Sequence, residues 1–366
     1  MNPFVLGAGL TQTLVADETQ FLMDSPDMQT FNETGPQAYR YLFRVHEIGA
    51  NGGVSVTDLQ TGSTQVLIQR ADWERLDPIT WTPWGTLLFG EEAGPAALPD
   101  PNVPSALKGL VYELNPRTLA VSARPMLGSK AHEGTDIDSK GNVYGISEIS
   151  TGAIYKFVPS TTGDLSAGQL YALQITNPVG DRTGTATWLP LDMNQAVIDA
   201  DVAAANVGAT GYGRPEDIVV AGEAGTEALY VAVTSEARVL KITLGTTPVV
   251  SEYIKAGVNA PSDFSWPDNL DVDAAGHLFI TEDPGGSFAG GKTAGDDIWV
   301  SSPGAGGNVT AAKVVRLASL TDCDAEPTGL KLDKNNQNLY VHVQHRGGNG
   351  IDMDMKISRA GGLVSR

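Results

Sequence analysis

Acidic residues recur at one position of a repeated segment. Asp77, Glu133, Glu216, Asp268 and Glu326 each begin a segment in which a short strand, a polar turn and an apolar strand follow. If these segments pack around a common axis, their leading carboxylates meet. Carboxylates at close range repel one another, and their pKa values rise unless a cation lies between them. The pattern therefore predicts a site for a hard cation such as calcium, which takes about six to eight oxygen ligands.

Each acid taken singly has an alternative role as a turn cap that binds backbone N–H groups. This role suits Asp77, which precedes Pro78. It suits the leading glutamates less well, because Glu is a poor turn former. An EF-hand loop between Asp271 and Glu282 is excluded, because Ala275 occupies a ligand position and the flanking residues alternate as in a strand.

Two histidines and one arginine are further candidates. His132 and His345 adjoin the ends of repeat segments, although a lone histidine is more often a hydrogen-bonded structural residue. Arg214 lies just before Glu216 and is suited to binding a phosphate or carboxylate through two parallel hydrogen bonds. The alternative for Arg214 is a simple ion pair with Glu216.

The repeats also predict the elements that position these residues. Turn sequences such as Asp138–Gly141 and Asp273–Gly276 separate residues that alternate in polarity, as in β-hairpins. The leading acids recur about every 50 to 60 residues, except for one interval of 83 residues. Periods near 50 residues that contain several strands are typical of propeller blades. We expect an all-β fold: a β-propeller with five recognisable blade repeats and five to six blades in total.

The expected propeller is a single domain over residues 1–366, with an insertion around 177–213 that includes a short helix within 192–205. Further strands are predicted before the first repeat, at 41–48, 53–59 and 64–69. Too few residues follow the last repeat to complete its sheet. The N-terminal strands are therefore expected to close the ring by joining the final blade, which removes open sheet edges.

Composition excludes several classes of function. The chain has 24 Lys and Arg against 43 Asp and Glu, a formal net charge of −19, so we expect no nucleic-acid partner. Cys323 is the single cysteine, which excludes an intramolecular disulfide and a multi-cysteine metal site. No apolar run approaches the roughly 20 residues of a membrane span, and no signal peptide is recognised. The expected partner is a small-molecule ligand or substrate.

Several motifs in one order resemble the PhoX-type alkaline phosphatases, over about Thr80 to His345. They are Thr82–Thr86, Glu91–Glu92, His132–Glu133, Ile154–Pro159, Arg214–Asp217, Pro267–Leu270 and Val343–His345. The resemblance implies a β-propeller whose axial carboxylates hold calcium and, in the phosphatases, a two-iron centre that hydrolyses phosphate monoesters. It also implies a periplasmic or secreted location.

The motifs and the repeat together give three sets of candidates. For catalysis they are Arg214, Glu133 and His132, and for substrate binding they are Arg214 and His345. The candidate metal ligands are Glu91, Glu92, Glu133, Glu216, Asp268 and Glu326.

One position departs from the family pattern. The family has a cysteine, a thiolate ligand of iron, immediately before the paired glutamates, and here that residue is Gly90. The chain is also shorter than the phosphatases of the family. Iron is therefore disfavoured, whereas calcium in an oxygen-ligand site is expected. The predicted function is a calcium-dependent phosphoester hydrolase. The alternatives are a non-enzymatic, calcium-stabilised propeller that binds a ligand or partner at the channel mouth, and, by fold analogy, a lactonase.

Overall fold

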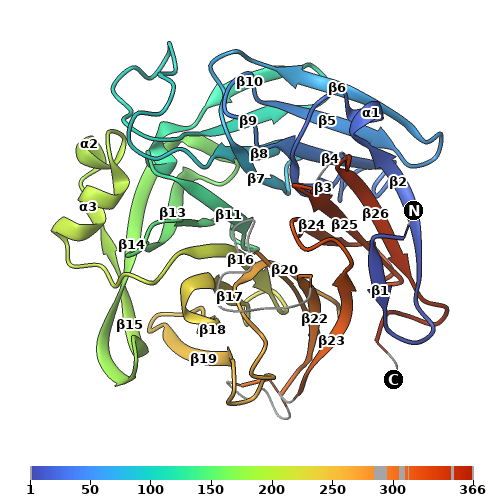
Figure 1. Cartoon of the computed structure of the whole chain (residues 1–366). Helices are drawn as coiled ribbons and strands as arrows, with labels where there is room; N and C mark the ends of the chain where they lie inside the picture. The colour runs from blue at the N-terminus through green and yellow to red at the C-terminus, as the bar shows by residue number, and fades with distance from the viewer. Residues whose placement is uncertain (1, 284–294, 305–309, 312, 348–349, 365–366) are drawn as a thin grey trace.

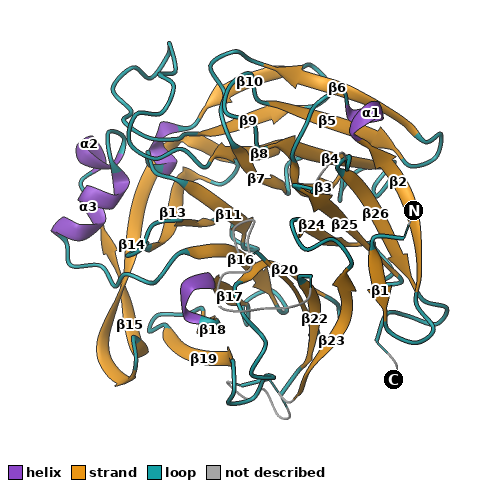
Figure 2. Ribbon diagram, in the orientation of Figure 1, coloured by secondary structure: helices purple, strands orange, loops and turns teal. Residues whose placement is uncertain are grey.

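The computed structural model describes residues 2–283, 295–304, 310–311, 313–347 and 350–364. Strands dominate, and their sheets surround a central axis as in a β-propeller (Figure 1 and Figure 2). The predicted all-β fold is confirmed. No helix in the described part of the chain is long and apolar enough to cross a membrane.

Two four-stranded sheets follow one another near the start of the chain. The first consists of β3 (Pro26–Phe31), β4 (Tyr41–His46), β5 (Gly53–Asp58) and β6 (Ser63–Gln69). The second consists of β7 (Leu76–Trp81), β8 (Leu87–Glu91), β9 (Val111–Asn115) and β10 (Ala120–Ala123), with η1 (Pro125–Leu127) after it. All strand pairs in both sheets are antiparallel.

A nine-stranded sheet occupies the middle of the chain. Its first half comprises β11 (His132–Ile137), β12 (Val143–Ser147), β13 (Ile154–Thr161), β14 (Asp164–Gly180) and β15 (Thr183–Pro190). Its second half comprises β16 (Pro215–Ala221), β17 (Ala228–Val233), β18 (Arg238–Thr243) and β19 (Val249–Lys255), with η2 (Thr234–Glu236) between β17 and β18. The halves are joined where β15 pairs with β19 through Gly184 and Thr185. Residues before β16 form α2 (Met193–Ala196) and α3 (Ala200–Asn206), in place of the one predicted helix.

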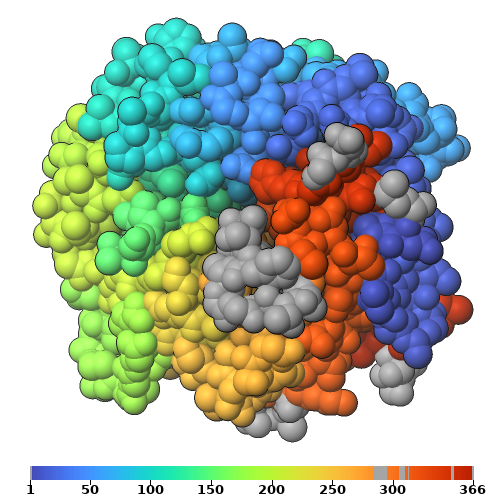
Figure 3. Space-filling model, viewed as in Figure 1, coloured from blue at the N-terminus to red at the C-terminus, as the bar shows by residue number. Residues whose placement is uncertain are grey.

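The last two sheets each include an N-terminal strand. One contains β20 (Pro267–Val272), β21 (Leu278–Glu282), β22 (Asp297–Ser302), β23 (Lys313–Leu320) and β1 (Phe4–Leu6). The other contains β24 (Glu326–Leu332), β25 (Asn338–Gln344), β26 (Met353–Ser358) and β2 (Thr11–Asp17), which α1 (Glu18–Phe21) follows. Figure 3 shows the blue N-terminal segment lying against the orange and red C-terminal strands.

The predicted strands at 41–48, 53–59 and 64–69 correspond to β4, β5 and β6. They do not join the final sheet, because they pair among themselves and with β3. The N-terminal strand that does pair in the final sheet is β2, which bonds to β26.

The innermost strands form a continuous ring of contacts. Strand β3 contacts β7, which contacts β11, and the series continues through β16 and β20 to β24, which contacts β3 again. Side-chain carboxylates connect several neighbours. Asp136, Asp217 and Asp271 accept hydrogen bonds from backbone N–H groups of the next innermost strand, at 2.7, 2.8 and 2.7 Å. Apolar clusters fill the space between sheets, as where Phe89 and Val54 pack in one core.

A register shift typical of a β-bulge interrupts the pairing of each innermost strand with its neighbour. In five of these strands the shifted stretch contains an acid: Asp27, Asp77, Glu133, Glu216 or Asp268. In β24 the shift lies between Thr328 and Lys331, and Glu326 precedes it. Bulges redirect side chains, and here the redirected side chains are carboxylates.

Candidate metal centre

A cavity of about 360 Å³ lies where the innermost strands begin. Ten carboxylates line it, together with Arg214, His345 and Thr328. The ten are Asp27, Glu47, Asp77, Glu92, Glu133, Glu148, Glu216, Asp268, Asp283 and Glu326. The lining is therefore strongly acidic, with one arginine and one histidine to oppose it.

Two positions of the inner β-hairpins supply most of the lining. The leading acids come from the starts of the innermost strands. A second group directly follows the second strand of a sheet: Glu47 follows β4, Glu92 follows β8, Glu148 follows β12, Asp283 follows β21 and His345 follows β25. The start of the first strand and the end of the second lie side by side in a hairpin. Five of the six hairpins therefore present two side chains to the axis, whereas the β16–β17 hairpin supplies only Glu216 from these two positions.

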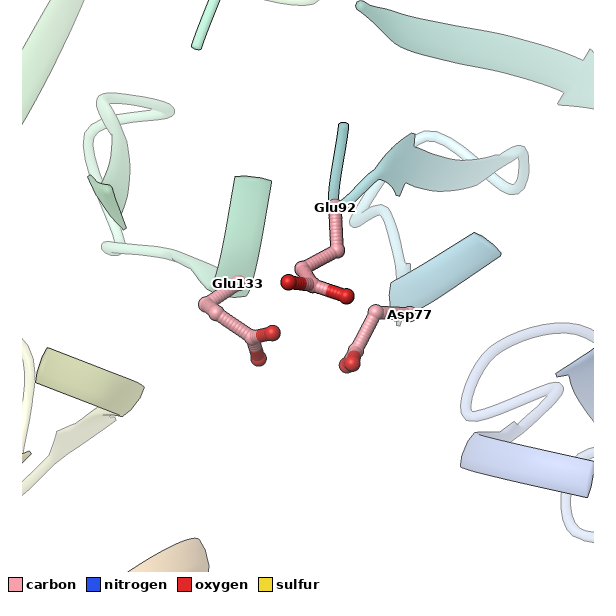
Figure 4. Close-up of side chains that lie close together, drawn as sticks. All are labelled: Asp77, Glu92 and Glu133. Carbon is pink, nitrogen blue, oxygen red and sulfur yellow. The ribbon is translucent and has the colours of Figure 1, made fainter. Parts of the chain in front are cut away.

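Two overlapping groups of three carboxylates have the spacing of a metal site. Asp77, Glu92 and Glu133 offer oxygens within 4.8 Å of one another, and so do Glu133, Glu148 and Glu216. Figure 4 shows the carboxylates of Asp77, Glu92 and Glu133 turned toward a common space from separate segments. Glu133 belongs to both groups and is therefore the central candidate ligand.

Burial, followed by repulsion between neighbouring carboxylates, raises the pKa values of these acids. It raises the pKa of Asp27 to about 8, with Glu47 as the main charged neighbour. It raises the pKa of Glu92 to about 10, with Glu148 contributing most after burial. The pKa values of five further acids are raised well above the usual range, for the same two reasons: Asp77, Glu133, Glu216, Asp268 and Glu326. The carboxyl groups of such a cluster ionise together at neutral pH only when a bound cation displaces their protons.

The donor set fits a hard cation. Carboxylate oxygens predominate in the lining, and calcium prefers oxygen ligands. The buried Oδ1 of Asp77 has no hydrogen-bond partner among the described residues. A buried carboxylate oxygen without a partner is costly unless a cation or water satisfies it, so Asp77 is suited to metal ligation.

Arg214 lies beside the carboxylates. Its Nε donates to Glu148 Oε1 at 2.5 Å, and its Nη2 lies 3.0 Å from Glu216 Oε1. Burial disfavours the cation, but the charges of Glu216 and Glu148 outweigh it and raise the pKa of Arg214. The guanidinium is still 36% exposed, so a ligand entering the cavity can reach it.

His345 lines the cavity next to two acids. Its Nε2 lies 3.6 Å from Glu326 Oε1 and 3.8 Å from Glu47 Oε2, and its side chain is 44% exposed. The structure therefore brings together seven predicted site residues: Glu92, Glu133, Glu216, Asp268, Glu326, Arg214 and His345.

Two predicted site residues lie outside the cavity. Glu91 is buried and accepts hydrogen bonds from the backbone N–H groups of Leu110 and Glu74. Successive side chains of a strand point to opposite faces, so Glu91 and Glu92 cannot both face the axis. His132 is buried between Lys130 and the Gly128 carbonyl, and burial lowers its pKa well below the usual range. It precedes Glu133 by one residue and is excluded from the axis for the same reason.

The structure also shows the surroundings of Gly90, the residue at the position where the family pattern has a cysteine. A Cβ added at Gly90 would lie 3.0 Å from His132 Cβ and 3.0 Å from Pro78 Cγ, so neighbouring side chains already occupy this space. Cys323 is exposed and does not line the cavity. The described lining therefore contains no thiolate ligand.

Five cavity acids were not among the predicted ligands: Asp77, which the repeat marked only as a leading acid, and Asp27, Glu47, Glu148 and Asp283. The sequence does mark Glu148 and Asp283 as candidates, because they follow a leading acid by 15 residues, as the predicted ligand Glu92 does. Asp27 and Glu47 come from a hairpin without a recognisable repeat, so nothing comparable marks them.

Comparisons with known proteins agree with this description. Residues 80–252 match the family model for Alkaline phosphatase PhoX. The structure of Pseudomonas fluorescens PhoX in complex with vanadate, a transition state analogue, is 17% identical and superposes with a TM-score of 0.76, over 99% of this chain and 97% of that one. A search of curated proteins finds no match.

More distant structures share only the fold. A luciferin-regenerating enzyme is 10% identical with a TM-score of 0.55, over 96% of each chain. An auxiliary nutrient binding protein from Bacteroides thetaiotaomicron is 10% identical with a TM-score of 0.54, over 92% of this chain and 69% of that one. The names of these two proteins indicate different functions, so the fold alone does not determine the reaction. The match over residues 80–252 confirms the resemblance of this chain to the PhoX alkaline phosphatases.

Proposed function

We propose that the protein is a calcium-dependent phosphoester hydrolase whose metal site is the axial carboxylate cluster. The observation that carries this proposal is the sharing of Glu133 by two three-carboxylate groups beside Arg214. The match to the PhoX family model supports the same reaction class.

The residues proposed to hold calcium are those with the closest approach to one another. Asp77, Glu92 and Glu133 form one ligand set, and Glu148 and Glu216 join Glu133 in the second. Asp268 and Glu326 line the same cavity and are proposed as further ligands. An oxygen-rich lining with Gly90 in place of cysteine favours calcium over iron. Bound calcium would polarise the phosphoryl oxygens and position a water molecule.

Arg214 is proposed to bind the phosphoryl group. A planar guanidinium matches two phosphate oxygens, and the negative charge of these oxygens grows as water attacks and the P–O ester bond breaks. Its contacts with Glu148 and Glu216 fix its orientation before substrate arrives. His345 also lines the cavity with an exposed imidazole and is proposed to contact the ester.

Several finer features of the architecture are part of the proposal. The closed series of contacts from β3 to β24 and back to β3 supports six blades in one domain. The pairing of β2 with β26 supports closure of the ring by an N-terminal strand. We also expect a periplasmic or secreted location, where calcium is abundant.

The direct test is hydrolysis of p-nitrophenyl phosphate by the purified protein with calcium and after chelation. We expect calcium-dependent release of p-nitrophenol, and a fall of about 100-fold or more for Glu133→Gln, because this residue belongs to both carboxylate groups. Glu223→Gln makes the same change of charge in an exposed loop and serves as the control. Absence of turnover with any phosphate ester at saturating calcium, iron or manganese would contradict the proposal.

The same experiment distinguishes the non-enzymatic alternative, which the replacement of the family cysteine by Gly90 favours. A protein whose melting temperature falls in chelator but which hydrolyses nothing would be a calcium-stabilised binding propeller. Its ligand would then occupy the acidic cavity without being cleaved.

A further inference from the structure

A long hairpin extends from the middle of the chain and connects two parts of the ring. Strands β14 and β15 form this hairpin, whose tip contains Asp181 and Arg182. It is the yellow-green hairpin at the edge of the molecule in Figure 1. Strand β15 also pairs with β19. The tip lies against the segment that precedes β16. Arg182 itself does not line the acidic cavity.

The tip of the hairpin binds the backbone just before Arg214. Arg182 Nη1 donates to the Gly211 carbonyl at 3.3 Å, and the Tyr212 hydroxyl donates to the Arg182 carbonyl at 2.8 Å. The Arg182 guanidinium also lies over the ring of Tyr212, 5.6 Å from its centroid. Tyr212 is fully buried, so the tip and this segment form one packed unit.

Glu236 connects Arg182 to the residue next to Arg214. Its Oε1 accepts hydrogen bonds from Arg182 Nη1 and from the backbone N–H of Gly213, both at 2.6 Å. Its other oxygen pairs with the buried Arg238. Charge-assisted hydrogen bonds of this kind are about twice as strong as neutral ones. A Cβ at Gly213 would lie 3.1 Å from Glu236 Oε1, so the two groups are in close contact.

Arg214 has a backbone conformation that needs such support. Its φ is +48°, in the left-handed region that non-glycine residues rarely adopt. Its N–H donates to the Ile149 carbonyl at 3.1 Å, and its carbonyl accepts from the Thr234 N–H at 2.9 Å. An unfavourable conformation of this kind persists where the surroundings hold it, and such positions are common in active sites.

We propose that Arg182 is a positioning residue for Arg214. Through Glu236 and Gly213, the hairpin tip holds the backbone that directs the Arg214 guanidinium into the acidic cavity. This inference rests on the proposed function, because it assigns to Arg182 a role in phosphate binding by Arg214. Arg182 is 36% exposed, and Glu236 also pairs with Arg238, so we expect the fold to survive replacement of Arg182.

The test is a double-mutant cycle on p-nitrophenyl phosphate hydrolysis, with inhibition by vanadate as a second readout. Arg182→Ala is expected to lower kcat/KM by about 10-fold to 100-fold, because small displacements of a binding group have effects of this size. Vanadate inhibition should weaken in parallel, whereas the calcium concentration for half-maximal activity should not change. Arg182→Lys should recover part of the loss, since lysine supplies the charge but lacks the planar guanidinium whose Nη1 reaches Gly211 and Glu236 while Nε and Nη2 bind Asp181. Val179→Ala, at the same tip and 80% exposed, is the control.

The double variant Arg182→Ala/Arg214→Ala separates positioning from general stabilisation. If Arg182 acts through Arg214, the double variant is no less active than Arg214→Ala. If the two losses multiply, or if Arg182→Ala retains the wild-type kcat/KM, the positioning role is contradicted while the proposed function stands. If the wild-type protein neither hydrolyses the ester nor binds vanadate, the proposed function fails and the positioning role fails with it.

Discussion

Neighbouring glutamates in this chain have different environments. Glu92 faces the axial cavity with the other carboxylates, whereas Glu91 faces the interior of its own sheet. Burial raises the pKa of Glu91 to about 8. Substitutions at these adjacent residues therefore distinguish the loss of a proposed cation ligand from the loss of a buried, hydrogen-bonded acid.

We predict different effects of the same substitution at these two positions. If Glu92 is a calcium ligand as proposed, Glu92→Gln should lower calcium affinity about 10-fold or more, because it removes a charged ligand oxygen. Glu91→Gln leaves the cavity lining unchanged and should not alter calcium affinity, although its amide NH2 would face a buried backbone N–H and lower the unfolding free energy by about 1 to 3 kcal/mol. Calcium titration of both variants by calorimetry checks this. Equal weakening of calcium binding by both changes would contradict the assignment.

The sequence predicted most of the cavity because acids recur at one place in a repeated hairpin. Asp77, which the repeat singled out, lines the cavity with the predicted ligands such as Glu133. The motifs that suggested Glu91 and His132 do not indicate which face of a strand a residue occupies. The alternation of side chains along a strand could have excluded one residue of each adjacent pair.

At the level of the elements, the position of each leading acid depends on close packing of innermost strands. Glu133 lies in the bulge of β11, and the next residue is Gly134. Here the backbone contacts β16 so closely that an added Cβ would lie 1.9 Å from Asp217 Oδ1 and 2.6 Å from the backbone N of Ile218. Glycine is therefore required for β16 to approach Glu133.

Gly134→Ala should destabilise the protein by about 1 to 3 kcal/mol, because the added methyl group forces the two strands apart. The matched control is Gly145→Ala in the adjacent strand β12, where the nearest atom to an added Cβ is 3.6 Å away. That control should change stability by less than about 1 kcal/mol. Denaturant unfolding measures both, and equal stability of the two variants would show that the strands are not in close contact at Gly134.

The hairpin pattern predicted the strands that alternate clearly, such as β12 and β21. It missed β1, β2 and β3. Strand β2 is mostly exposed or half-buried, so it has no apolar face to recognise. Strand β3 is fully buried but includes Asp27 and Gln29, so its composition resembles a loop. Both strands are specified by pairing with distant segments, and local sequence does not record such pairing.

For the whole molecule, the acidic cavity explains part of the formal net charge of −19. Ten of the 43 acidic residues line this one space, and mutual repulsion among them opposes folding when they ionise. A cation bound at the proposed site would neutralise them and stabilise the folded state. Calcium at about 100 times its Kd would add about 2.7 kcal/mol to the free energy of unfolding.

The raised pKa values determine how the folding stability of the metal-free protein changes with pH. The pKa of Asp27 rises from 3.8 to about 8, and that of Glu92 from 4.5 to about 10. Between these values the folded state retains protons that the unfolded chain has released. The stability that these protons provide is complete below the unfolded pKa values and is lost as pH rises toward the folded ones. Calcium competes with the protons, so its stabilising effect should grow over the same range.

The most direct test of the central claim is the melting temperature of the protein in excess chelator and in calcium, from about pH 5 to about pH 9. We predict that the melting temperature in chelator falls as pH rises, and that calcium raises it by an amount that increases with pH. A melting temperature that is the same in chelator and in calcium at every pH would contradict the assignment of the axial carboxylates as a cation site.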